Sequence, residues 1–243
     1  MWADLVGRFR VVAPDLIGFG WSDKPRPYDY SILDQASLVE NLLAELGIER
    51  VHVLAHDYGD TVTQELLARH EDRKGLTLES VCFLNGGLFP ETHRALPVQR
   101  VMASKLGWVV GSVMTKKAFG AGMKRIFGRG TPPSAAVIDE LWTLLRHQDG
   151  QRVLHLLIGY MAERRRHRER WVGALVRTKV PLRVIDGVAD PVSGAHMVAR
   201  YRELIPNPDV VELAAIGHYP QVEDPSGVLG AFLAFHERLG TFS

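Results

Sequence analysis

The fold of this chain is decided by residues 51–60, which read VHVLAHDYGD. The apolar and β-branched residues at the start of the stretch are typical of a buried strand, and apolar residues at helical spacing follow it. Between the two, the small residues Ala55 and Gly59 are typical of a very tight turn around one strained residue. The stretch therefore predicts a strand, a sharp turn and a helix, with one side chain raised above the end of a sheet.

The residue at the centre of this turn is Asp57. We expect its carboxylate to lie at the N-terminus of the following helix, where the helix dipole stabilises a negative charge. A carboxylate held in this way can attack carbon and form an ester with the enzyme. Taken alone, Asp57 is equally typical of a helix N-cap, so its interpretation depends on partners elsewhere in the chain.

Two further stretches place such partners directly after predicted strands. Residues 186–192 read DGVADPV and contain Asp190, and residues 216–220 read IGHYP and contain His218. Nucleophile, acid and histidine follow one another in the chain order of an α/β-hydrolase triad. The rival position for the acid, after the preceding strand, is taken by the neutral Asn85, which favours Asp190.

Each member of this predicted triad has a role that its chemistry supports. His218 would take a proton from water, which then attacks the ester on Asp57, and Asp190 would orient the imidazole and stabilise its charged form. The backbone N–H of Tyr58 would donate to the oxyanion. An aspartate nucleophile suits displacement at saturated carbon, as in an epoxide ring or a carbon–halogen bond, better than cleavage of an amide or a simple ester.

Strands and helices alternate along most of the chain, which predicts a doubly wound, mostly parallel sheet. Strands are expected at residues 10–15, 51–55, 80–85, 181–186 and 210–213. Ser31 and Asp34 predict a capping box at the start of the helix before residue 51. Between residues 97 and 175 the pattern is helical throughout. We therefore expect a core of residues 1–96 and 176–243 with an inserted helical cap at residues 97–175.

Three features of the expected cap have two interpretations each. Tyr160 and Trp142 can reach the substrate, Tyr160 as a proton donor to an epoxide oxygen, but packing inside the cap is the commoner role of such rings. The run ERRRHRER at residues 163–170 is typical of a solvated helix face. The alternative is contact with a phosphate or a membrane surface.

The composition argues against several other classes of protein. With 29 basic and 28 acidic residues, the charge gives no indication of a nucleic-acid partner. Cys82 is the only cysteine, no apolar segment is long enough to span a membrane, and no signal peptide is visible. His52 and His56 share no helical face, so we expect no metal site, and nothing indicates a cofactor. The sequence predicts a cytoplasmic protein that acts on a small molecule.

Several motifs are those of a known superfamily. Haloalkane dehalogenases and epoxide hydrolases of the α/β-hydrolase superfamily are similar to this chain at VVAPD (11–15), GFG (18–20), SDKP (22–25), HDYG (56–59) and GHYPQVEDP (217–225). The mesoderm-specific-transcript hydrolase family is similar at longer motifs: HDYGD (56–60), NGGLFPETHR (85–94) and RWVGAL (170–175). This second resemblance spans nearly the whole chain.

The resemblance implies an epoxide hydrolase-like enzyme with the triad Asp57, His218 and Asp190, acting on a small apolar substrate. The alternatives are a haloalkane dehalogenase-like activity or a non-catalytic ligand-binding protein on the same fold. Tyr58 stands where haloalkane dehalogenases carry the Trp that helps to bind the halide. The sequence also begins after the position of the family's His-Gly-x-Pro motif. We therefore expect N-terminal strands to be missing, which leaves the strand at residues 10–15 without neighbours.

Overall fold

A computed structural model describes residues 1–72 and 76–242 of the chain. Within these residues one sheet is formed, in which parallel strands lie in the order β1-β2-β3-β4. The strands are β1 (Arg50–His56), β2 (Thr77–Leu84), β3 (Leu182–Gly187) and β4 (Val210–Leu213). The predicted α/β fold with a mostly parallel sheet is confirmed.

Helices pack against both faces of this sheet. They are α1 (Trp2–Val6), α2 (Ile32–Glu45), α3 (Tyr58–Glu71), α10 (Arg168–Arg177), α11 (Ala195–Leu204) and α13 (Pro225–Arg238). The short helix α12 (Pro220–Glu223) packs against α13. Successive side chains of a strand point to opposite faces. In β2, Val81 and Phe83 pack with residues of α2, α3, α10 and α11, whereas Cys82 and Leu84 pack with α13 and the start of the chain. Both faces of the sheet are therefore buried, as expected for a parallel sheet.

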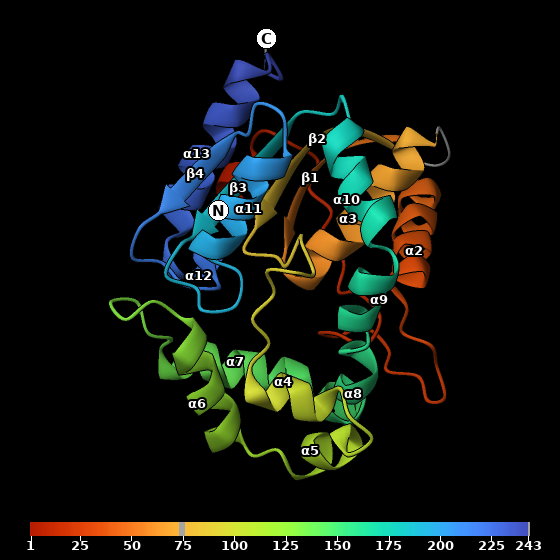
Figure 1. Cartoon of the computed structure of the whole chain (residues 1–243), viewed down its shortest axis with the longest axis vertical. Helices are drawn as coiled ribbons and strands as arrows, with labels where there is room; N and C mark the ends of the chain where they lie inside the picture. Colours follow the sequence, from red (N-terminus) through yellow and green to blue (C-terminus); the bar gives the residue numbers. More distant parts are fainter. Residues whose placement is uncertain (73–75, 243) are drawn as a thin grey trace.

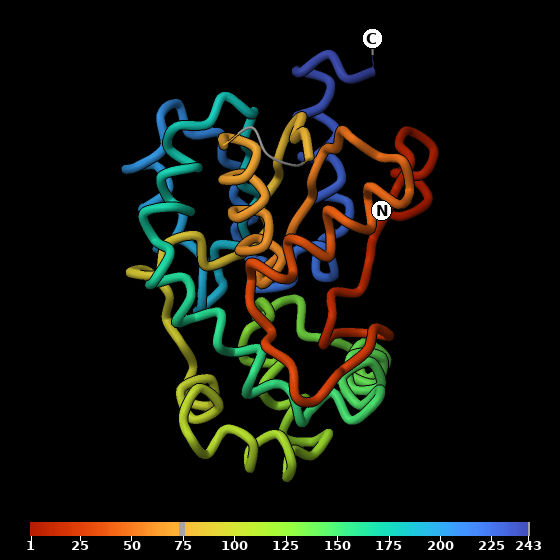
Figure 2. Tube along the Cα trace, turned by 90° about the vertical axis from the view of Figure 1, so that its right-hand side faces the viewer, coloured from red at the N-terminus to blue at the C-terminus, as the bar shows by residue number. Residues whose placement is uncertain are grey.

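A second layer of helices lies beyond the end of β2 (Figure 1). It is made of α4 (Pro97–Met102), α5 (Gly107–Val113), α6 (Lys116–Ile126), α7 (Ala135–Arg146), the 3-10 helix η1 (His147–Arg152) and α8 (Leu154–Leu157). Figure 2 shows the same division from the side, with the yellow and green helices below the rest of the molecule. No helix in the part of the chain that the structure describes is long and apolar enough to cross a membrane.

The chain returns from this layer to the sheet through α9 (Tyr160–Arg166) and α10. Helix α10 packs against α3, and its Trp171 is 1% exposed. The indole Nε1 of Trp171 donates a hydrogen bond to Glu65 of α3 at 2.8 Å. The end of the segment 97–175 therefore shares the packing of the core, and the domain boundary at residue 175 stays a prediction.

Two local predictions need correction. The strand predicted at residues 10–15 is wrong, because none of the described strands pairs with this segment and a strand needs a neighbour for its hydrogen bonds. The predicted capping box is half formed: Ser31 Oγ accepts from the backbone N–H of Asp34 at 3.1 Å. The carboxylate of Asp34 accepts from the hydroxyl of Tyr28, and the N–H of Ser31 donates to the carbonyl of Asp29.

Candidate active site

The turn at Asp57 joins the end of β1 directly to the start of α3. Asp57 has φ 47° and ψ −104°, a conformation that is unfavourable for any residue other than glycine. Its backbone N–H donates to the carbonyl of Leu84 at 3.3 Å, which ties the turn to the end of β2. The Asp57 side chain is 33% exposed, so a small molecule can reach it. The turn has more room at residue 59 than predicted, because a Cβ on Gly59 would lie 3.9 Å from Ala55, an ordinary van der Waals distance.

His218 and Asp190 reach Asp57 from the loops that follow β4 and β3. His218 Nδ1 lies 2.8 Å from Asp190 Oδ2, and His218 Nε2 lies 3.7 Å from Asp57 Oδ2. The carboxyl ends of parallel strands meet at one edge of a sheet, which is where ligands bind in such folds. The structure thus brings the three predicted residues together, with the imidazole between the two carboxylates.

The carboxylate of Asp190 is fixed by donors on both oxygens. Its Oδ1 accepts from the N–H of Val192 at 2.7 Å. Its Oδ2 accepts from Asn85 Nδ2 at 3.2 Å and from Ser193 Oγ at 2.8 Å, in addition to His218. These bonds hold Asp190 in the position that orients the imidazole. The sequence does not predict that Ser193 and Asn85 donate hydrogen bonds to Asp190. From the sequence, Asn85 is interpreted only as a neutral residue that cannot serve as the acid of the triad.

The charges of the three residues stabilise one another. Burial raises the pKa of Asp57, but the hydrogen bond and charge of His218, with His56 and Arg164, bring it well below its ordinary value. Burial lowers the pKa of His218, but Asp190 and then Asp57 outweigh this effect and raise it to about 10. Near neutral pH the site therefore holds an imidazolium between two carboxylates.

The other predicted site residues divide into two groups. The ring of Tyr58 packs on Phe19 at 4.9 Å and on Tyr160 at 5.2 Å, and Tyr160 is buried at the start of α9. Tyr58 opens α3, so its N–H has no acceptor within the helix and is available to an oxyanion. Trp142 is not brought to the triad, because its ring packs on Phe119 of α6 at 5.6 Å. Trp142 is half-buried, and the guanidinium group of Arg146 lies over its ring.

Arg164 is a site residue that sequence analysis missed. Its side chain is 2% exposed, its Nε donates to Thr61 Oγ1 at 2.7 Å, and its Nη2 donates to the backbone carbonyl of Asp57 at 3.3 Å. The prediction that residues 163–170 form a solvated face is wrong for this residue. One face of α9 packs on α3, and a run of charges does not show which of its members lies on that face.

Tyr219 is a second residue whose place sequence analysis missed. Its ring centre lies 5.2 Å from that of His218. Burial raises the pKa of its phenol, and the charges of Asp57 and Asp190 raise it further. The phenol is therefore close to the carboxylates of Asp57 and Asp190, and its only sequence signal is the position next to His218.

Two buried carboxyl groups lie beneath this edge of the sheet. Among the described residues, the oxygens of Asp60 and of Asp186 have no hydrogen-bond partner. Burial raises the pKa of each well above its ordinary value, and the nearby charge of Asp57 or Asp190 acts in the same direction. Both groups therefore favour the protonated, uncharged form.

The two histidines of β1 have partners of their own. His52 Nδ1 lies 2.9 Å from Ser80 Oγ, and His56 Nε2 lies 2.7 Å from the backbone carbonyl of His218. In residues 1–72 and 76–242, no three histidine, cysteine or acidic side chains are grouped as a metal ion would require. His56 instead supports the loop that carries His218.

Comparison with known sequences gives a family model and close relatives. The model described as alpha/beta hydrolase fold matches residues 2–103. The mesoderm-specific transcript protein of Mus musculus is 43% identical over 246 residues, which cover 97% of this chain and 73% of the mouse protein. LipZ of Mycobacterium tuberculosis, whose name describes it as a hydrolase, is 44% identical over 224 residues, which cover 92% of this chain and 78% of LipZ.

Solved structures with the same fold are more distant in sequence. The haloalkane dehalogenase DatA from Agrobacterium tumefaciens C58 superposes with a TM-score of 0.74 at 18% identity, covering 92% of this chain and 78% of DatA. The epoxide hydrolase CorEH superposes with a TM-score of 0.70 at 19% identity, covering 93% of this chain and 81% of CorEH. At these identities the two structures bear on the fold alone.

Proposed function

Because this chain belongs to the α/β-hydrolase family, with the mesoderm-specific transcript proteins among its relatives, we propose that it opens small epoxides through a covalent ester on Asp57. The observation that carries the proposal is a carboxylate, in place of a serine hydroxyl, at the strained turn. It faces His218 Nε2 at 3.7 Å, and Asp190 holds the other side of the imidazole at 2.8 Å. This arrangement supplies a nucleophile, a base and an orienting acid.

The first step is attack by an Asp57 oxygen on one carbon of the epoxide ring. The ring C–O bond breaks, its electron pair stays on the epoxide oxygen, and that oxygen takes a proton from the hydroxyl of Tyr160. Burial raises the pKa of Tyr160, and the charge of Asp57 raises it further, which supports their proximity. An alkoxide is more basic than a phenolate, so the phenol still donates to it.

The second step is hydrolysis of the ester. Water gives a proton to His218 Nε2 and attacks the ester carbonyl carbon, while the N–H of Tyr58 donates to the oxygen that becomes negative. The tetrahedral intermediate then collapses: the bond between the carbonyl carbon and the product oxygen breaks, the leaving alkoxide takes the remaining proton of the attacking water, and the Asp57 carboxylate is restored. Ester formation removes one of the two negative charges that raise the pKa of His218 to about 10. The pKa therefore falls when the base is needed, and the imidazolium gives its proton, through solvent, to the phenolate left on Tyr160.

Two alternatives have less support. Displacement of a halide would use the same nucleophile, but Tyr58 is buried between Phe19 and Tyr160 and presents no indole N–H to a leaving halide. Hydrolysis of ordinary acyl esters would need a hydroxyl or thiol nucleophile in place of Asp57. A non-catalytic protein that binds small molecules on this fold is the remaining alternative.

The test is the intact mass of the His218→Gln variant after incubation with a panel of epoxides and haloalkanes. Without its base the enzyme should stall as the ester, and its mass should rise by the whole epoxide, with the added group on Asp57. The variant that also carries Asp57→Ala should show no gain. A gain equal to an alkyl group alone would indicate the halide reaction. A folded variant that gains no mass across the panel would favour the binding protein.

A further inference from the structure

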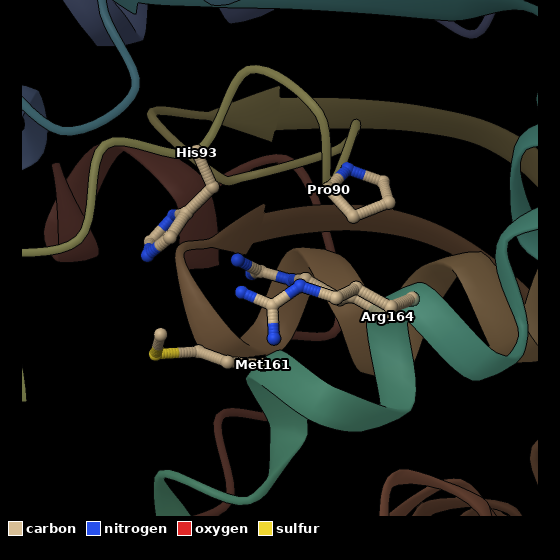
Figure 3. Close-up of a pocket in the computed structure, with 5 residues that line it drawn as sticks. Pro90, His93, Met161 and Arg164 are labelled. Carbon is tan, nitrogen blue, oxygen red and sulfur yellow. The ribbon is translucent and has the colours of Figure 1, made fainter. Parts of the chain in front are cut away.

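A small pocket lies between α9 and the loop that follows β2, and one of its lining residues, Arg164, also bonds the backbone of Asp57. Its lining residues are Pro90, His93, Met161, Arg164 and Arg165. Figure 3 shows the guanidinium group of Arg164 and the ring of His93 directed toward the same space, with Met161 on one side of it. The pocket is therefore lined mainly by nitrogen donors, although sequence analysis predicts an apolar substrate.

Arg164 brings an unused hydrogen-bonding group to this pocket. Its Nε and Nη2 are engaged by Thr61 and by the backbone of Asp57, but its Nη1 has no partner among the described residues. The side chain is 2% exposed, so water does not readily compensate for the missing partner. A guanidinium group that is buried with free N–H groups is costly unless a ligand completes its hydrogen bonds.

The backbone is shaped around this guanidinium group. A Cβ on Gly87 would lie 2.2 Å from Arg164 Nη1, so the side chain can take this position only because residue 87 is glycine. The same Cβ would lie 3.2 Å from His93 Nδ1. Glycine at this position therefore allows Arg164 and His93 to approach one another over the Gly87 backbone.

His93 is also unpaired. Neither of its ring nitrogens has a hydrogen-bond partner in residues 1–72 and 76–242. Burial lowers its pKa, the positive charge of Arg164 lowers it further, and the resulting value is about 4. At neutral pH His93 is therefore uncharged and offers one N–H donor without adding to the positive charge.

Among the described residues, no carboxylate forms an ion pair with Arg164, although the charge of Asp57 acts on it. The charge of Asp57 faces His218, and Asp60 favours its uncharged form because burial raises its pKa. Glu91, on the same loop as His93, pairs with Arg168 and Arg200. Arg164 therefore has no direct ion pair, and the exposed Arg165 adds a second positive charge at the rim.

From these observations we propose that the pocket binds a carboxylate group of the substrate, through Arg164 Nη1 and His93 with Arg165 at the rim. The inference rests on the proposed function and refines it: the substrate is a small epoxide that carries a carboxylate. The guanidinium fork matches the two oxygens of a carboxylate. Because Arg164 also bonds the backbone of Asp57, the carboxylate would lie only a short chain away from the carbon that is attacked.

Binding of unreactive probes tests the pocket without any turnover. We expect butyrate to bind the wild-type protein at least about ten-fold tighter than butyramide, because hydrogen bonds to charged groups are worth about that factor. Arg164→Gln should abolish the preference. Arg166→Gln, which removes an exposed arginine of the same helix, should retain it. Equal binding of the two probes, or a preference that survives Arg164→Gln, would overturn the proposal, as would tighter binding of propylphosphonate than of butyrate.

Two further measurements keep the outcome clear. If Arg164→Gln does not fold, the NMR titration of His93 in the wild-type protein decides, because a bound carboxylate should raise its pKa above about 4. An unchanged His93 pKa in saturating butyrate would then count against the pocket. In the His218→Gln variant, glycidate should form the ester at least about ten-fold faster than glycidamide. If glycidamide forms the ester as fast as glycidate does, the proposed function stands but the carboxylate pocket is rejected.

Discussion

Two clusters of charged side chains lie along α3, and they differ in whether their hydrogen bonds are complete. In the middle of the helix, the buried Glu65 accepts from Arg69, Arg170 and Trp171, and each carboxylate oxygen has two donors at 2.8–3.1 Å. At the start of the helix, Arg164 reaches Thr61 and Asp57 but keeps an unpaired Nη1 among the described residues. Each cluster contains one arginine from the run at residues 163–170.

The difference separates two uses of a buried charge. A cluster with complete hydrogen bonds holds α10 against α3 and leaves nothing for a ligand to bind. A cluster with free N–H groups stabilises the protein less, because part of its desolvation remains uncompensated. Such a cluster is typical of a binding site. We therefore expect changes at Glu65 to alter folding and changes around Asp57 to alter chemistry.

The largest effect is expected from Asp57→Ala. Turnover should fall by at least about 10³-fold, as it does when a member of a catalytic triad is removed. The free energy of unfolding should change by no more than about 1 kcal/mol, since the Asp57 side chain is one-third exposed and its contact with His218 is 3.7 Å long. Steady-state kinetics and urea unfolding measure the two quantities. Activity that persists in the variant would remove Asp57 from the mechanism.

The opposite result is expected from Glu65→Gln. The amide cannot accept from all of the donors that Glu65 holds, so the free energy of unfolding should fall by about 2 kcal/mol. Turnover per folded molecule should stay unchanged, because Glu65 accepts from Arg69, Arg170 and Trp171, none of which belongs to the proposed site. Glu45→Gln, at the exposed end of α2, is the matched control. If turnover falls while stability is unaffected, the contrast between the two clusters is wrong.

A third effect is expected from pH, and the part of it that belongs to the triad is the part that His218→Gln removes. Since the pKa of His218 is raised from 6.5 to about 10 in the folded protein, its contribution to stability is complete below pH 6.5 and is lost as the pH rises through 10. The pKa of Glu65 is lowered, so its contribution is lost only at acid pH. Thermal unfolding at pH 6.5 and 9.5 should show a loss in the wild-type protein that is smaller in His218→Gln. Equal losses would contradict the ion pair.

The triad residues could be predicted because the local sequence pattern places each of them directly after a strand. Asp57, Asp190 and His218 each follow a strand, and parallel strands end at the same edge of the sheet, so their sequence positions were enough to predict that they meet. Arg164 could not be found in this way. It belongs to a run of charged residues, and its burial depends on which face of α9 packs against α3.

The sequence alone determined the parallel sheet, the helical layer after β2 and the strained turn at Asp57, because these depend on periodicity and on residues that are neighbours in the chain. Only the tertiary structure decided that residues 10–15 form no strand, since an apolar pattern cannot supply a partner for its hydrogen bonds. It also decided which polar groups were left unpaired, among them Arg164 Nη1 and the nitrogens of His93. Hydrogen-bond completion is a property of packed elements, and no single stretch of sequence contains it.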